Sequence, residues 1–161
     1  MRRPRHLANQ WHGRTPRETA PARTRALPPS AALPDEPAQF ADPGADPAVA
    51  TAAAFTSAAE TLRELDFADP CPIATVALEV ACTHEGLRRA TADVFASWIE
   101  ALAARYAGAG IGTDTARDTA GSVIALLEGA FMLARAAHDT APVRTAARAA
   151  AAVVRDALES G

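Results

Sequence analysis

The fold is decided by the stretch Ala125-Leu126-Leu127-Glu128-Gly129-Ala130-Phe131-Met132-Leu133-Ala134-Arg135, the middle of a segment that runs from Thr113 to His138. Apolar residues recur here at three- and four-residue steps, the period of an amphipathic helix, and Thr113 or Asp114 is expected to cap it. This apolar face comprises Val123, Leu126, Leu127, Ala130, Leu133, Ala134 and Ala137. A second stripe carries almost no side-chain volume: Ser122, Ala125, Gly129 and Ala136. Because two faces of low polarity need two packing partners, we expect the domain's own core on one side and a second subunit on the other.

Four more helices are expected around this one. Asp46-Pro47 is a typical helix start, because the Asp side chain accepts from free amides and Pro fits the first helical position. A β-branched run after Pro72 has no second strand-like run to pair with, so we interpret it as a short buried helix. The expected ranges are 47–65, 73–82, 84–107 and 142–158. The sequence therefore predicts an all-α domain of about five helices over residues 46–161.

Residues 1–45 have a different composition. They hold eight of the twelve prolines and few large apolar side chains, so burial cannot offset the ordering entropy and we expect a disordered leader. Residues 1–25 carry seven arginines against Glu18, whereas the rest of the chain carries nine arginines against eighteen acids. Such a basic tail is typical either of a solvated leader or of weak, salt-dependent contact with DNA phosphates.

Several classes of function are disfavoured by the residues present. Cys71 and Cys82 are too few and too far apart for a disulfide framework or a CxxC metal site, and the four histidines do not cluster with them, so no metal or cofactor is expected. No catalytic motif is present, and we expect no enzyme activity. No segment has the long uninterrupted apolar run of a membrane span. Arg2-Arg3 is not followed by the apolar region of an export signal, so we expect a cytoplasmic protein.

Two runs carry a resemblance to a known family: 71–79 (Cys-Pro-Ile-Ala-Thr-Val-Ala-Leu-Glu) and 125–135. Together with the Leu87…Phe95…Trp98…Leu102 helix between them and Pro142 after them, they are similar to the C-terminal domain of the LmrA/YxaF-like branch of TetR-family regulators. The resemblance covers 70–158, is weaker over 46–69, and is absent before that. It implies a homodimer built through the last two helices as a four-helix bundle, with a small, often apolar effector bound inside each subunit.

A TetR-type regulator also has a three-helix, helix-turn-helix DNA-binding head, and residues 1–45 do not match one. We expect a truncated gene, a wrong start site or a headless protein. Three hypotheses follow: a ligand-binding, dimerising regulator domain, a DNA binder acting through the arginine-rich tail, and a helical oligomerisation module without a ligand.

The candidate functional residues fall into two sets. The ligand-binding candidates are Leu78, Glu79, Phe95, Trp98, Leu102 and Glu128. The apolar members are equally typical of core packing, while Glu79 and Glu128 would orient a ligand, pair with an arginine such as Arg135, or face solvent. The dimer-interface candidates are Ser122, Ala125, Leu126, Gly129, Leu133, Ala136, Ala150, Val154 and Leu158.

Overall fold

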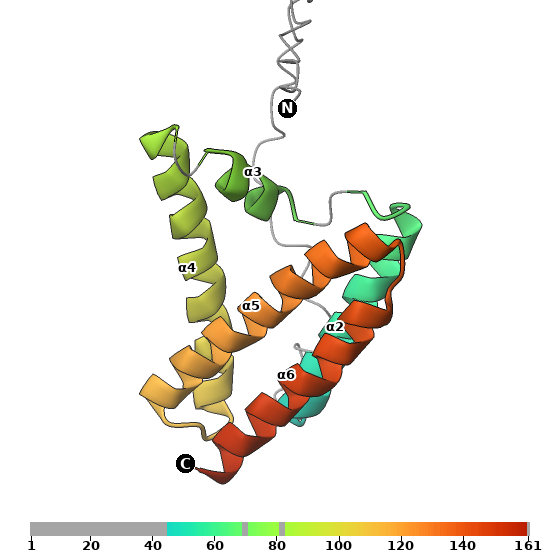
Figure 1. The fold of residues 1–161 in the computed structure, drawn as a ribbon. Coiled ribbons are helices and arrows are strands. Elements are labelled where there is room, and N and C mark those ends of the chain that lie inside the picture. The colour runs from blue at the N-terminus through green and yellow to red at the C-terminus, as the bar shows by residue number, and fades with distance from the viewer. Residues whose placement is uncertain (1–44, 69–70, 81–82, 161) are drawn as a thin grey trace, which may run out of the picture. The chain divides into compact units, whose positions relative to one another are not determined.

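The computed structural model describes residues 45–68, 71–80 and 83–160, and within these ranges it contains five helices and no strand (Figure 1). The helices are α2 (Pro47–Glu64), α3 (Pro72–Val80), α4 (Glu85–Gly108), α5 (Thr113–Ala137) and α6 (Ala141–Glu159). The all-α class and the helix ranges predicted from the sequence are confirmed, with ends that differ by one or two residues. The leader predicted for residues 1–45 lies outside the described residues except for Ala45.

Two of the helices begin at side chains that satisfy their free amides. The Asp46 carboxylate accepts from the backbone N–H of Ala48 at 2.8 Å and of Val49 at 3.2 Å, and Pro47 follows directly. At α4, Nδ1 of His84 accepts from the N–H of Leu87 at 3.2 Å. The cap expected for α5 is wrong: Thr113 is already helical, and Gly112 precedes it without a side-chain hydrogen bond.

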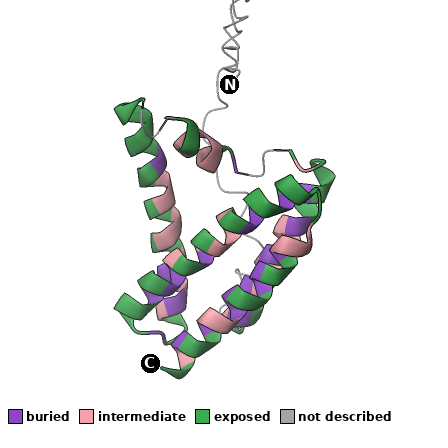
Figure 2. Ribbon diagram, in the orientation of Figure 1, coloured by how far each residue is buried: buried purple, intermediate pink, exposed green. Residues whose placement is uncertain are grey.

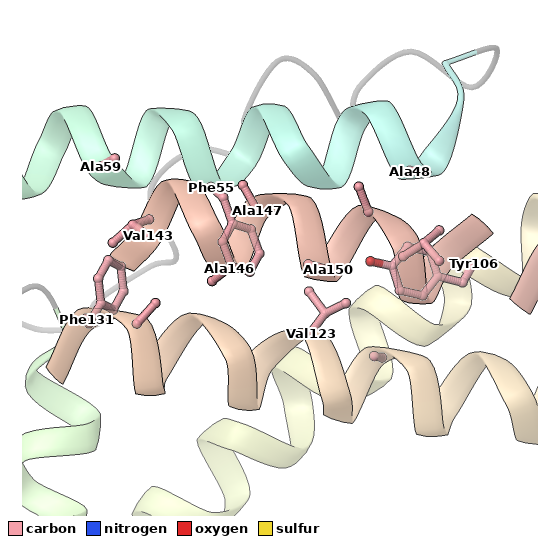
Figure 3. Packing of buried hydrophobic residues seen from close by; sticks show 14 of the residues in the cluster. Ala48, Phe55, Ala59, Tyr106, Val123, Phe131, Val143, Ala146, Ala147 and Ala150 are labelled. Atoms are coloured by element: carbon pink, nitrogen blue, oxygen red, sulfur yellow. The ribbon is translucent and has the colours of Figure 1, made fainter. Parts of the chain in front are cut away.

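The core lies where α6 packs against both α2 and α5, while α5 also packs against α4 and α4 against α3. Figure 3 shows Phe55 of α2, Val143 and Ala147 of α6, and Phe131 of α5 directed into this space. More than half of the buried hydrophobic residues are alanines, of which the most fully buried are Ala116, Ala120, Ala134 and Ala150. Because alanine fills little volume, the helices must pack closely to exclude water.

A buried hydrogen bond joins α2 to α4. The hydroxyls of Thr51 and Tyr106 lie 2.8 Å apart, and both side chains are almost fully buried. Thr51 Oγ1 also donates to the Pro47 carbonyl at 2.7 Å, and a hydroxyl has only one hydrogen, so Tyr106 is the donor between the two. This pair joins the second turn of α2 to the last turn of α4.

Two helix ends meet beside the core. Asp66 and Phe67 after α2 and His138 after α5 are the non-glycine residues with positive φ among those described. The Phe67 and His138 rings lie 4.3 Å apart, and His138 Nε2 lies 3.6 Å from the Asp66 carboxylate. The turn that leads towards α3 is thereby held against the corner between α5 and α6.

Candidate functional site

One side of α5 is exposed along the length of the helix, and we call it the α5 outer face. Its residues are Ser122, Ala125, Gly129, Met132, Leu133 and Ala136, and all six are exposed (Figure 2). Met132 is 60% and Leu133 63% exposed, which is unusual for large apolar side chains. A Cβ atom at Gly129 would meet nothing within 4 Å. The α5 outer face is therefore uncovered, with small side chains at its centre and large apolar side chains at its edge.

The structure separates the residues expected at a dimer interface into two groups. Ser122, Ala125, Gly129, Leu133 and Ala136 lie together on the α5 outer face. Leu126 and Leu158 are half-buried and pack against the chain's own core. Ala150 and Val154 are fully buried within the chain, so they already have partners and present no surface to a second subunit. Met132, which was not among the candidates from the sequence, is exposed on the same side of the helix.

The outward side of α6 divides into a basic flank and a flank of small and apolar residues that also carries the exposed acid Asp156. Arg144, Arg148 and Arg155 repeat at helical spacing on the first, and Arg144 lines a cleft together with α2 residues. Ala149, Ala152 and Val153 lie on the second, and none of them is fully buried. The helix packs against both α2 and α5, and Arg144 places the basic flank on the side of α2.

The aromatic ligand-binding candidates lie on the inner side of α4. Phe95 and Trp98 are half-buried, with ring centroids 5.3 Å apart in an edge-to-face arrangement. Trp98 and Leu102 pack against the core cluster. These three side chains form one apolar surface on α4, as expected from the sequence, and part of it remains accessible.

Glu128 of α5 lies beside the thiol of Cys71, at the start of α3. Burial and, to a smaller extent, the neighbouring Glu128 carboxylate raise the pKa of Cys71 to about 12, against the lowering effect of the Ala74 and Ile73 backbone. Glu128 is half-buried, which distinguishes it from the exposed acids of the other helices. A half-buried carboxylate at the meeting of α3 and α5 is suited to orient a polar group of a ligand.

Leu78 and Glu79 do not join this group. Leu78 is 70% exposed and Glu79 is also exposed, on the outer side of α3. The physical reason is that a nine-residue helix packed mainly on α4 leaves one side uncovered. Leu78 therefore does not line an enclosed site, and the exposure of Glu79 agrees with the solvent-facing alternative.

Two general features bear on the kind of site present. Among the described helices, α5 is long and apolar enough to cross a membrane by length and composition, and only 22% of its most apolar window is buried within the chain. Within the described ranges, no group of three or more His, Cys, Asp and Glu side chains is placed to hold a metal ion.

Comparison with known proteins gives consistent results. Residues 47–149 match the model of the family described as transcriptional regulator LmrA/YxaF-like, C-terminal domain. Two uncharacterised HTH-type transcriptional regulators of Mycobacterium tuberculosis, from strains CDC 1551 and H37Rv, are each 35% identical over 89 residues. The aligned part is 52% of this chain and 46% of each relative, so the chain spans about half the length of the curated relatives it matches. No solved structure matches the chain.

Proposed function

Because the chain belongs to the LmrA/YxaF-like C-terminal domain family of TetR-type transcriptional regulators, we propose that it is the dimerising and ligand-sensing domain of such a regulator. Its matched relatives are named as HTH-type regulators, and we propose that this domain serves a DNA-binding element of that type. The family consists of transcriptional regulators and not of enzymes. This confirms the expectation from the sequence that the chain has no enzyme activity.

The observation that carries the dimer is the α5 outer face. Met132 and Leu133 expose most of their surface, although the large apolar residues in the chain are few. Small residues at Ala125 and Gly129 allow a second helix to approach closely, and the large side chains beside them can pack around the contact. A twofold axis through this face brings each large side chain against a small residue of the other copy.

A second copy fits this surface better than a lipid bilayer does. The other sides of α5 pack on α4 and α6, so the helix cannot enter a membrane without leaving the core. Asp114 and Asp118 continue the outer side towards the start of the helix, where they would have to enter the hydrocarbon. We propose an interface of α5 with the side of α6 that carries Ala149, Ala152 and Val153, burying more than about 1,000 Å² in total.

The experiment compares three alanine- or glycine-to-arginine variants by sedimentation. Gly129→Arg and Ala125→Arg should yield soluble, helical monomer, because each places an uncompensated charge in the contact. Ala96→Arg, at an exposed position of α4, is the matched control and should remain dimeric. A wild-type protein that sediments as a monomer at micromolar concentration would contradict the proposed dimer.

We propose that the effector is a small apolar compound that contacts Phe95, Trp98 and Leu102, with Glu128 orienting its polar group. The support is the accessible aromatic surface on α4 and the half-buried carboxylate opposite α3. Leu78 and Glu79 are left out of this proposal because they face outward.

Fluorescence of Trp98 tests this proposal once the second tryptophan is removed by Trp11→Phe. A panel of apolar aromatic compounds should contain one that changes the Trp98 emission saturably and raises the melting temperature. Leu102→Ala should weaken this response, whereas Leu78→Ala should leave it unchanged. If no compound acts while the dimer forms, the domain is an oligomerisation module without a ligand.

A further inference from the structure

A cleft of different character lies between the end of α2 and the start of α6. It has a volume of about 170 Å³ and is partly open to solvent. More of its lining surface is apolar than polar, and the residues that line it are Thr56, Ala59, Glu60, Arg63, Thr140 and Arg144. Neither helix end belongs to the aromatic surface on α4 or to the α5 outer face. The cleft is therefore separate from both surfaces of the proposed regulator domain.

The two guanidinium groups in the lining are poorly neutralised. Arg63 forms no ion pair with any residue that the structure describes, and the nearest carboxylate of Arg144 is Asp139 at 3.9 Å. By contrast, Glu85 lies within 2.8 Å of both Arg88 and Arg89 on α4. Two arginines from different helices thus line one hollow, Arg63 without an ion pair to a described residue and Arg144 with a long one to Asp139.

The other polar side chains of the cleft are Thr56, Glu60 and Thr140, and their hydrogen bonds and charge limit which ligands fit. Thr140 Oγ1 accepts from Arg144 Nη1, and its own hydrogen is donated to no described residue, so it is available to a ligand acceptor. The Thr56 hydroxyl already donates to the Ala52 carbonyl at 3.0 Å. Glu60 is the acid of the lining and opposes an anion there.

We propose that the α2–α6 cleft binds a small molecule through an oxyanion group, a phosphate or a carboxylate, held between Arg63 and Arg144. The planar guanidinium donates two parallel hydrogen bonds to such a group, and two guanidiniums from different helices match its several acceptor oxygens. Thr140 adds a neutral donor. This site does not rest on the proposed dimer or effector.

Calorimetric titration of the full chain tests the site, with inorganic phosphate and succinate as separate probes. Each is added over the millimolar range against chloride of matched ionic strength. At least one probe should bind saturably. Arg63→Gln and Arg144→Gln should each weaken binding about tenfold, since each removes a charge-assisted pair of hydrogen bonds. Glu60→Gln should tighten binding, because it removes the opposing charge.

Arg155→Gln is the matched control, since it removes the same charge from α6 outside the cleft lining. It should bind as the wild type does, and circular dichroism should show equal helicity in all variants. Binding of phosphate alone or of succinate alone assigns the class of oxyanion. Absence of saturable binding by both probes would overturn the proposal, and so would an equal loss in the Arg155 and Arg63 variants, which indicates only general charge attraction.

Discussion

Tyr106 holds a phenol hydroxyl in the core with Thr51 as its hydrogen-bond partner. The two hydroxyls are not equivalent, because Tyr106 donates and Thr51 accepts while donating onward to Pro47. We predict that Thr51→Val destabilises the domain by about 1–3 kcal/mol, since it leaves the Tyr106 hydroxyl buried without a partner. Tyr106→Phe should cost only about 0.5–1.5 kcal/mol, because Thr51 keeps its bond to Pro47. Urea unfolding of the two variants measures the difference, and equal losses would show that the hydroxyl pair is not isolated from water.

Cys71 and Tyr106 also set the response to alkaline pH. Burial raises the pKa of the Cys71 thiol from 9.0 and of the Tyr106 phenol from 10.0, each to about 12. Both groups hold their proton more tightly when folded, so the stability they contribute is present below pH 9 and is lost as the pH rises to 12. Cys71→Ala should remove the part of the loss that begins near pH 9. Tyr106→Phe should remove the part above pH 10, as melting temperatures across this range would show.

For single residues, helical periodicity predicted which residues share a side of a helix. It did not predict which of those sides are covered by neighbouring helices. Ala125 and Gly129 lie on an open face, as predicted from the small-residue stripe. Ala150 and Val154 were assigned to the interface, yet both are core residues. Helical spacing indicates which residues share a side of α6, but not that α2 and α5 cover that side. The contact between Glu128 and Cys71 joins distant segments, and no local pattern contains it.

At the scale of elements, α2 offers a direct test of a cap recognised from sequence. Asp46→Ala should lower the stability by about 1 kcal/mol, because two backbone N–H groups lose their acceptor. Asp46→Asn is the control, since an amide oxygen at the same place also accepts, and it should cost much less. Chemical denaturation of both variants gives the comparison. Equal losses would mean that the carboxylate charge, and not the cap geometry, stabilises the helix.

The helix ranges were predictable because alanine, proline and glycine mark starts and ends clearly in this chain. Pro47 and Pro142 lie in the first turns of α2 and α6, as their fixed φ requires. The backbone conformation at the end of α5 was less predictable than its position. His138 closes it in a left-handed conformation that usually favours glycine, and the Phe67 ring stacked near it comes from the other end of the domain. The exposure of α3 likewise depends on how few partners that short helix has.

At the scale of the whole molecule, the proline-rich segment and the helical domain are proposed to behave independently. The change in composition near Pro43 and Pro47 predicts that limited proteolysis removes the leader and leaves a resistant fragment from about residue 46. The fragment should retain the helicity and the dimer of the full chain. Loss of folding after clean removal of residues 1–40 would contradict this division.

The alanine-rich core has a consequence for mutational tolerance. In most domains the damaging core substitutions are truncations, which leave cavities. Here most of the fully buried positions on α5 and α6 are alanines, such as Ala134 and Ala150, which have only one methyl group to lose. Substitution by a larger side chain is more damaging, because each added methyl group must push two closely packed helices apart, at a cost of about 1–3 kcal/mol. A saturation scan should therefore find Ala150→Val more harmful than Leu126→Ala, and the gene should accumulate losses of bulk more readily than gains.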